Sequence, residues 1–296
     1  MKHKPIMSQA LGREKPAGVL TEEVTGVSLG REGVARFHLF DTAFPEYLHE
    51  QFLAFAQGLP KRLDPDPYDG SGLRRRRYAS FIFEPGLCSL LAMGRSYDKL
   101  DRPKARYFQP TAYQPEEGDH VRTFDSLTEQ QITSPVLAAL VAADFRIARH
   151  SRLLPTCPAY IVGVHFICLE PLGRRLAAVS PNTIHRDGEL LTFAHLMGKR
   201  NVLGGWNAIT HTSNVDRHPS EVPTEDILKQ FTLEGPGESY VVDDRKVAHF
   251  VEGVGLENVC EWGHRTIALV DFSPLRRVRS NDLDLMNVAE LLDLGQ

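Results

Sequence analysis

The chain has 296 residues, with 34 Lys and Arg against 38 Asp and Glu, so its formal net charge at pH 7 is −4. A hydrophobic content of 42% is enough to bury a core, which excludes a globally disordered chain. The mild acidity gives no electrostatic reason to expect nucleic acid as the main partner, although a local basic patch is compatible with it. No apolar run reaches the roughly 18–20 residues of a membrane span, and no apolar segment follows the basic N-terminus as in a secretory signal.

The four cysteines lie far apart in the sequence and form no CxxC pair, which argues against a zinc ribbon or a disulfide framework. A few widely spaced cysteines of this kind are typical of proteins in a reducing compartment. We therefore expect a cytoplasmic protein with no membrane partner and no nucleic-acid partner. Its oligomeric state stays open, with a homodimer as one option.

The first part of the chain mixes strand and helix patterns. Residues 1–16 are polar and predict a flexible arm. Short, β-branched and glycine-punctuated stretches between residues 18 and 40 predict strands. Residues 45–59 carry apolar side chains at helical spacing and predict a helix, and a polar loop follows over 61–73.

A run of four arginines at 74–77 leads directly into the buried-strand pattern YASFIFEP. The clearest helix of the sequence covers residues 133–151. Ser134 suits its N-cap and Pro135 suits its first helical position. We expect this half, up to about residue 150, to support the core that follows.

The second half is dominated by short strand patterns. Between Pro158 and Pro274 such runs recur with turn residues between them, apart from a short helical pattern near 224–231. Closely spaced strands indicate an antiparallel sandwich or jelly roll rather than a βαβ sheet. Residues 283–294 predict a terminal helix. We thus expect a mainly β fold with flanking helices (α+β), with a jelly-roll core over about 158–274 in a single domain from 17 to 296.

The motif HRDGE carries the clearest chemical signal. His185 and Asp187 are separated by one residue, so on an extended strand both side chains point to the same face. Such a pair supplies two of the three ligands in a 2-His-1-carboxylate facial triad, which leaves three positions open on Fe(II). Chance alone supplies roughly 0.7 HxD pairs in a chain with 12 histidines, and HRDG could also be a surface turn. The pair therefore needs support from elsewhere in the chain.

Two later residues give that support. His249 lies in the strand-like segment VVDDRKVAHFVEGV, and Arg265 begins the buried-strand pattern of GHRTIALVDF. Arg265 shares a face with the inward apolar residues of that strand, and an inward guanidinium needs an anion. His249 could instead be a hydrogen-bonded core residue, in which case His264 is the other candidate for the third ligand. Arg265 could instead form an internal ion pair with Asp271 or a glutamate.

The order HxD…H…R resembles the signature of Fe(II)- and 2-oxoglutarate-dependent dioxygenases, and among them the bacterial 2OG-Fe dioxygenase group that includes L-isoleucine hydroxylase. The resemblance is carried by HRDGE, by YIVGVHFICLEP before it and GGWNAIT after it, and by the upstream RRRRYASFIF and VRTF. It covers roughly residues 74–272. The resemblance implies a double-stranded β-helix core, Fe(II) held by His185, Asp187 and His249, O2, and 2-oxoglutarate bound through its distal carboxylate to Arg265.

The reaction implied by this resemblance is hydroxylation of an unactivated C–H bond in a small free amino acid or derivative, with succinate and CO2 as co-products. The same enzyme class could instead close a ring or desaturate an amino acid in natural-product biosynthesis. A non-catalytic cupin-like binding protein is the alternative from another class, and a protein or peptide substrate is a weaker option. Mass analysis of the product would separate the first two alternatives.

Three further residues are candidates for the substrate pocket. Arg77 at the strand entrance and Arg122 in VRTF could each reach an anionic substrate, and His165 could line the pocket. Each has an ordinary structural alternative, because arginine runs commonly form a solvated face and a lone histidine in an apolar strand is commonly packed and hydrogen-bonded.

Overall fold

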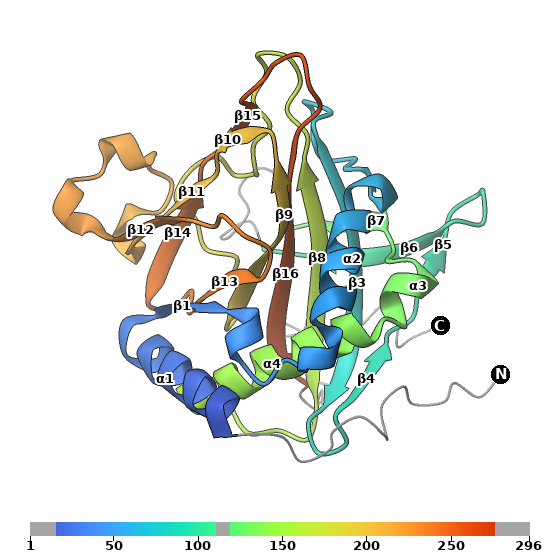
Figure 1. Ribbon diagram of the computed structural model, residues 1–296, viewed down its shortest axis with the longest axis vertical. Coiled ribbons are helices and arrows are strands. Elements are labelled where there is room, and N and C mark those ends of the chain that lie inside the picture. Colours follow the sequence, from blue (N-terminus) through green and yellow to red (C-terminus); the bar gives the residue numbers. More distant parts are fainter. Residues whose placement is uncertain (1–15, 111–118, 276–296) are drawn as a thin grey trace.

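A large antiparallel sheet forms the centre of the protein, whose computed structural model describes residues 16–110 and 119–275 (Figure 1). Its eight strands follow the order β1-β13-β9-β16-β8-β3-β2, with β4 paired to β3. These strands are β1 (Val34–His38), β2 (Asp64–Pro65), β3 (Arg74–Glu84), β4 (Ser89–Ala92), β8 (Tyr160–Leu169), β9 (Thr192–Arg200), β13 (Glu238–Val242) and β16 (His264–Pro274).

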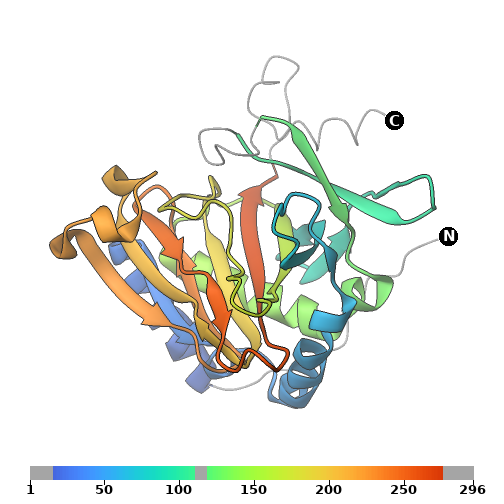
Figure 2. The same ribbon diagram turned by 90° about the horizontal axis from the view of Figure 1, so that it is seen from above.

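Three smaller sheets complete the β structure. One of them, in the order β12-β11-β14, faces the main sheet across a cluster of buried apolar side chains that both sheets contribute, among them Ile209, Phe231 and Tyr240 (Figure 2). The others pair β10 with β15 and β5 with β6 and β7. Their strands are β5 (Ser96–Tyr97), β6 (Pro103–Phe108), β7 (Val121–Asp125), β10 (Val202–Gly204), β11 (Trp206–His211), β12 (Ile227–Thr232), β14 (Val247–Val251) and β15 (Val254–Leu256).

Helices cover the other face of the main sheet (Figure 1). They are α1 (Pro16–Glu32), α2 (His49–Gly58), α3 (Glu129–Ile132) and α4 (Pro135–Ser151), with short 3-10 turns at Leu39–Asp41, Glu46–Leu48, Pro60–Arg62, Thr212–Asn214, Pro219–Glu221 and Thr224–Asp226. The helices predicted over 45–59 and 133–151 are confirmed, and the Ser134 hydroxyl accepts the Val136 N–H as its N-cap role requires. The mainly β fold with flanking helices is likewise confirmed.

The strands predicted between residues 18 and 40 are wrong for most of that range, because α1 occupies it and only β1 is a strand. The glycines that were interpreted as strand punctuation are packing contacts of this helix. A Cβ on Gly26 would lie 2.5 Å from the His150 Cβ, and a Cβ on Gly30 would lie 2.8 Å from the Ser151 carbonyl oxygen. Close approach to α4 therefore explains both glycines, and packing outweighs the local strand pattern.

The short helix predicted near 224–231 is also wrong in its larger part. A single 3-10 turn at Thr224–Asp226 gives way to β12, which pairs with β11. Of the arm predicted for residues 1–16, the structure describes only Pro16, which begins α1. The terminal helix predicted for 283–294 lies outside the described residues.

A buried polar triad ties α4 to the main sheet. The His195 Nε2 lies 2.9 Å from an Asp144 carboxylate oxygen, and its Nδ1 lies 2.8 Å from the Ser239 hydroxyl oxygen. All three side chains are almost completely shielded from solvent. Because each polar atom lost from such a site leaves its partner unsatisfied, the triad fixes how α4 sits on β9 and β13.

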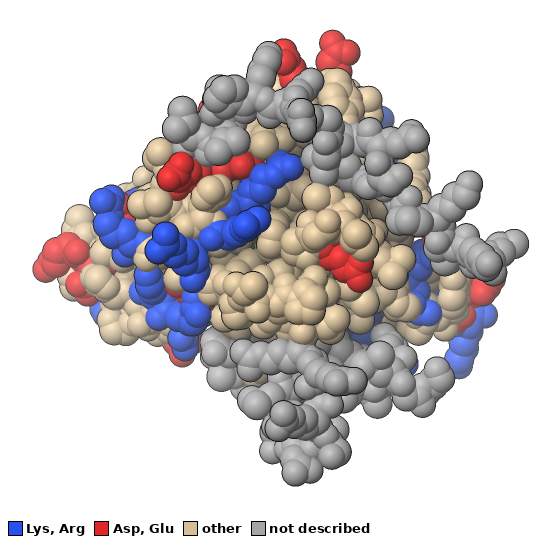
Figure 3. Space-filling view, turned by 90° about the horizontal axis from the view of Figure 1, so that it is seen from below, with Lys and Arg blue, Asp and Glu red and all other residues tan. Residues whose placement is uncertain are grey.

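The underside of the molecule carries a basic patch, which the mildly acidic overall charge left open. Figure 3 shows Lys and Arg side chains gathered on this side, where α1 and α4 lie in Figure 1. A shallow groove there is lined by arginines of both helices and of the residue after α4: Arg31, Arg146, Arg149 and Arg152. Within the described ranges, no helix combines the length and the apolar content that crossing a membrane requires.

Candidate metal and substrate site

A pocket lies between the inner face of the main sheet and the segment that contains the HRDGE motif. Side chains alternate along β16, so Arg265, Ile267, Leu269 and Asp271 line the pocket while Ala268 faces the helices. The inward face predicted for Arg265 is therefore confirmed. Strands β3, β8, β9 and β13 each contribute residues to the same pocket.

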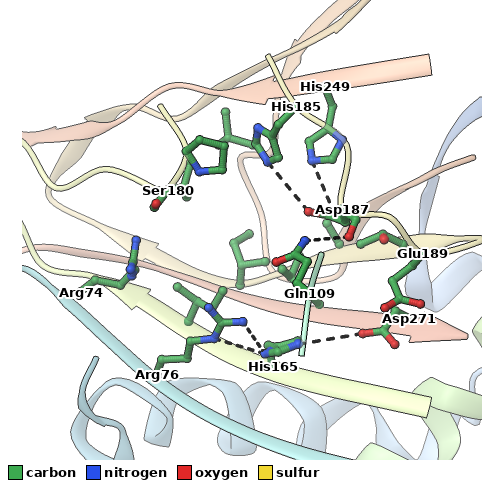
Figure 4. A pocket seen from close by; sticks show the side chains of 18 of the residues that line it. Arg74, Arg76, Gln109, His165, Ser180, His185, Asp187, Glu189, His249 and Asp271 are labelled. Atoms are coloured by element: carbon green, nitrogen blue, oxygen red, sulfur yellow. Dashed lines mark hydrogen bonds and ion pairs between the residues drawn. The ribbon is translucent and has the colours of Figure 1, made fainter. Parts of the chain in front are cut away.

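The structure brings His185, Asp187 and His249 together at one wall of this pocket (Figure 4). The His185 Nε2 lies 3.9 Å from one Asp187 carboxylate oxygen, and the His249 Nε2 lies 3.6 Å from the other. Two backbone hydrogen bonds between residues 185 and 249 hold the two imidazoles side by side, with ring centroids 4.4 Å apart. One ligand atom from each residue lies within 4.8 Å of the others, so the group could hold a metal ion.

The protonation of both imidazoles suits a metal site. The His185 Nδ1 lies 2.8 Å from the Thr183 carbonyl oxygen, which can only accept, so Nδ1 is the donor and a neutral ring has its lone pair on Nε2. Burial lowers the pKa of His249 to about 4, although the nearby Asp187 opposes this shift. Both rings can therefore present a neutral, unprotonated nitrogen, as metal binding requires.

Asp244 contacts two of the candidate ligands on the side away from the pocket: the backbone of Asp187 and the ring of His249. One of its carboxylate oxygens accepts the backbone N–H groups of Asp187 and Gly188, at 2.6 and 2.8 Å, and the other lies 3.8 Å from the His249 Nδ1. Burial, followed by the charge of Asp187, raises the pKa of Asp244 well above its usual value. Sequence reasoning missed this residue, although a second carboxylate in VVDD, five residues before His249, was the available signal.

Arg265 is buried in the pocket wall, with only 3% of its surface exposed. In the described part of the chain, no carboxylate lies within 4 Å of its guanidinium, and its Nε–H has no hydrogen-bond partner. The alternative ion pair with Asp271 is thus not formed. Burial lowers the pKa of Arg265, and the adjacent Tyr240 acts in the opposite direction. An anionic ligand would fit this unpartnered group.

The four consecutive arginines of β3 divide between its two faces. Arg74 and Arg76 line the pocket, and the alternate residues Arg75 and Arg77 point to the opposite face. The structure therefore places Arg77 away from the pocket, where it forms an ion pair with Asp64. The four arginines therefore do not form one solvated face, because Arg74 is buried and Arg76 is half-buried in the wall of the pocket.

The other two substrate candidates, His165 and Arg122, both line the pocket. The His165 Nδ1 lies 2.7 Å from an Arg76 Nη. Arg122 donates to the Gln109 side-chain oxygen at 2.7 Å, and the Gln109 amide donates to the Asp187 carbonyl oxygen at 2.7 Å. Gln109, which sequence reasoning missed, thus connects the β6–β7 hairpin with the motif that holds the candidate metal ligands.

The rival histidine does not reach this site. The His264 Nδ1 lies 2.9 Å from the Thr266 hydroxyl oxygen, and its ring stacks on Trp262 with the centroids 4.8 Å apart. Neither the ring nor its stacking partner lines the pocket. His249 is therefore the histidine that the structure brings to the HRDGE motif.

Residues 58–271 match the family model described as 2OG-Fe dioxygenase. The chain is 31% identical over 169 residues to L-isoleucine-4-hydroxylase from Bacillus thuringiensis. The aligned residues make up 56% of this chain and 65% of that protein. The chain is also 26% identical over 168 residues to 3(1)-hydroxy-L-isoleucine 4-dioxygenase from Pantoea ananatis. These residues make up 56% of this chain and 63% of that protein. The chain thus spans just under two thirds of the length of these relatives.

A solved structure resembles nearly the whole chain. The crystal structure of IDO from Bacillus thuringiensis superposes with a TM-score of 0.67 at 22% sequence identity, over 90% of this chain and 100% of that one. At this identity the likeness concerns the fold, and it confirms the predicted β core with flanking helices, the double-stranded β-helix.

Proposed function

Because the chain belongs to the 2OG-Fe dioxygenase family, we propose that it is an Fe(II)- and 2-oxoglutarate-dependent dioxygenase that hydroxylates a small free amino acid or derivative. Membership of this family implies Fe(II), 2-oxoglutarate and O2 as the cofactor and cosubstrates. The observation that carries the proposal is the convergence of His185, Asp187 and His249 in one pocket, beside a buried arginine whose Nε has no hydrogen-bond partner in the described part of the chain. The printed names of the two relatives support an amino-acid substrate.

In this proposal His185, Asp187 and His249 hold the iron. The donor set fits, because two neutral imidazole nitrogens and one carboxylate form the facial triad that leaves positions open on Fe(II). Asp244 would orient the group, since it fixes the backbone at Asp187 and lies behind the His249 ring.

Arg265 would bind the distal carboxylate of 2-oxoglutarate. Its guanidinium is buried without a carboxylate partner in the described residues, and a planar guanidinium can donate two parallel hydrogen bonds to a carboxylate. When iron and 2-oxoglutarate are bound, they supply the oxidising chemistry that converts 2-oxoglutarate to succinate and CO2 and oxidises a substrate C–H bond. The apolar side chains of Ile267 and Leu269, next to Arg265 on the same face, would exclude bulk water from the cosubstrate.

The assay of this proposal measures succinate formed by the purified chain with Fe(II), ascorbate, 2-oxoglutarate and air, against a panel of free amino acids. We expect one or a few panel members to raise succinate formation, and Asp187→Ala to abolish it while the fold is retained. Full turnover by Asp187→Ala would refute the assignment of the triad. An absence of succinate with every panel member, in a chain shown to bind iron, would refute the amino-acid substrate and favour a cupin-like binding protein or a peptide substrate.

The product distinguishes the proposed hydroxylation from its alternative within the class. Hydroxylation adds one oxygen atom to the amino acid, whereas ring closure or desaturation removes two hydrogen atoms. Mass spectrometry of the reacted amino acid therefore decides between them. A role in natural-product biosynthesis, a cytoplasmic location, a homodimer and the division into an arm and one domain over 17–296 all stay predictions.

A further inference from the structure

Arg76 places a positive charge in the pocket that neither the metal nor the cosubstrate would use. No carboxylate of the described ranges lies within ion-pair distance of it, in contrast to Arg74, whose Nε donates to Asp66 at 2.7 Å. The polar contact of Arg76 is the neutral His165 ring, and its guanidinium carbon lies 4.3 Å from the centroid of the Phe124 ring. Burial lowers the pKa of Arg76 to about 10, so it remains charged at neutral pH. A desolvated guanidinium in this state favours an anionic ligand.

Carboxylates lie at the other end of the same stretch of pocket floor. Asp271 accepts the Gly163 N–H at 3.1 Å, and its second carboxylate oxygen lies 3.9 Å from the His165 Nε2. Glu189 lines the pocket nearby and accepts the Ser273 hydroxyl at 2.8 Å. Figure 4 shows both carboxylates on the side of His165 opposite to Arg76. The pocket floor therefore has a guanidinium at one end and two carboxyl groups at the other, of which Glu189 has its pKa raised by burial.

His165 separates the two ends without adding a charge. Burial, followed by the charges of Arg76 and Arg122, lowers the pKa of His165 well below its usual value. The ring stacks on Tyr78 with the centroids 4.2 Å apart, which fixes its plane. Since Arg76 can only donate, the His165 Nδ1 accepts and its Nε2 carries the proton.

Three neighbouring strands of one sheet hold these groups. Tyr78 of β3 and Leu269 of β16 both stand opposite His165 of β8, and Asp271 stands opposite Gly163. A Cβ at Gly163 would lie 2.4 Å from an Asp271 carboxylate oxygen, so only glycine leaves room for this carboxylate against β8. The separation of the charges is thus built into paired strands rather than mobile loops.

We propose that Arg76, His165 and Asp271 form a binding strip for the head group of an α-amino acid, with the carboxylate at Arg76 and the ammonium group at Asp271 and Glu189. The inference rests on the proposed function and deepens it, because it names the groups of the substrate that the pocket recognises. The strip lies across the pocket from His185 and His249, so a substrate held this way directs its side chain toward the candidate metal ligands (Figure 4). A charge at each end, rather than one charge alone, selects a zwitterion.

The test pairs changes in the protein with changes in the ligand. The probe is the panel amino acid that most stimulates succinate formation, together with its primary amide, which lacks the carboxylate charge, and its 2-hydroxy acid, which lacks the ammonium group. KM is measured for each with Arg76→Met, Arg76→Lys and Asp271→Asn at saturating 2-oxoglutarate. Arg75→Met is the matched control, because Arg75 lies next to Arg76 but points to the opposite face, where it donates to Glu170.

We expect the amide to have a KM about 30-fold above that of the amino acid with the unmodified chain, and this ratio to fall below about threefold in Arg76→Met. Arg76→Lys should restore part of the ratio, and Arg75→Met should leave it unchanged. The KM of the 2-hydroxy acid, divided by that of the amino acid, should likewise fall in Asp271→Asn. In each case kcat should change much less than KM, because the strip binds the part of the substrate that does not react.

Other outcomes overturn the inference. An amide that performs as well as the amino acid with the unmodified chain excludes recognition of the carboxylate. An equal rise of KM for amino acid and amide in Arg76→Met, with melting temperature and iron content retained, assigns Arg76 a structural role through His165. A 2-hydroxy acid or a dicarboxylic acid that is preferred over the amino acid excludes the ammonium subsite. If a panel amino acid is still turned over in any of these outcomes, the proposed function stands and only the binding strip is refuted. If no amino acid is turned over, both the proposed function and the binding strip are refuted.

Discussion

Gly205, between β10 and β11, offers a test of Arg265 that leaves the arginine itself unchanged. Its φ is +77°, in the left-handed region, and a Cβ at this position would lie 2.9 Å from the Arg265 Nε and 3.0 Å from its Cδ. Gly205→Ala therefore introduces backbone strain and also pushes the guanidinium from its place. We expect the variant to bind 2-oxoglutarate more weakly and iron as before.

The two effects of Gly205→Ala have different sizes and different readouts. An alanine in the left-handed region costs roughly 1–2 kcal/mol of unfolding free energy. A displaced guanidinium that loses one charge-assisted hydrogen bond to the cosubstrate forfeits about 2 kcal/mol, which corresponds to a rise of roughly 30-fold in the KM for 2-oxoglutarate. Chemical denaturation measures the first effect, and initial rates of succinate formation measure the second.

Gly173→Ala separates strain from displacement. Gly173 has a φ of +58°, but a Cβ there would meet open space in the described part of the chain. This variant should lose similar stability and keep the KM for 2-oxoglutarate unchanged. If Gly205→Ala also keeps that KM, despite being destabilised as much as Gly173→Ala, Arg265 does not anchor the cosubstrate.

Three further predictions concern burial and close contacts. Burial raises the pKa of Glu22 to about 7 from an ordinary 4.5, so the free energy of unfolding should fall by about 3 kcal/mol as the pH rises from 4.5 to beyond 7. Urea denaturation of Glu22→Gln at pH 5 and pH 8 should lack this part of the pH dependence, and an identical dependence in both chains would contradict it. Asp144→Ala should cost about 3–4 kcal/mol in the same assay because it leaves the buried His195 without its charged partner, whereas Asp144→Asn should cost less. Gly163→Ala should displace the Asp271 carboxylate and raise the KM for the amino acid but not for its 2-hydroxy acid; an equal rise for both would point to general distortion.

Two of the three candidate metal ligands, His185 and Asp187, could be predicted because their signal is local. The one-residue spacing of His185 and Asp187 places both on one face of an extended segment, and the same alternation turned Arg265 inward. The supporting groups arise from contacts between distant segments. Asp244 reaches Asp187 across 57 positions and Gln109 reaches it across 78, so the residues next to Asp187 in the sequence indicate neither contact.

The two wrong predictions of secondary structure share a physical cause. In α1, Gly26 and Gly30 look like strand punctuation, but they are the contact points at which the helix meets α4. In 227–232 the helical pattern is overridden by pairing of this segment with β11. In both places a tertiary contact outweighs the intrinsic preference of the residues, and that contact is not visible from the segment alone.

The arginine run of β3 has a consequence for how this strand finds its register. Four identical side chains in succession carry no information about which of them should face the pocket, because a shift by one residue would present Arg75 and Arg77 there and preserve the number of guanidinium groups. The register must therefore be fixed by the apolar end of the strand, where Phe81 and Phe83 would leave the helix-facing core if the strand slipped. A shift of the strand by one residue would thus leave the number of arginines in the pocket unchanged. Which arginine contacts His165 is set by Phe81 and Phe83, several residues further along the strand.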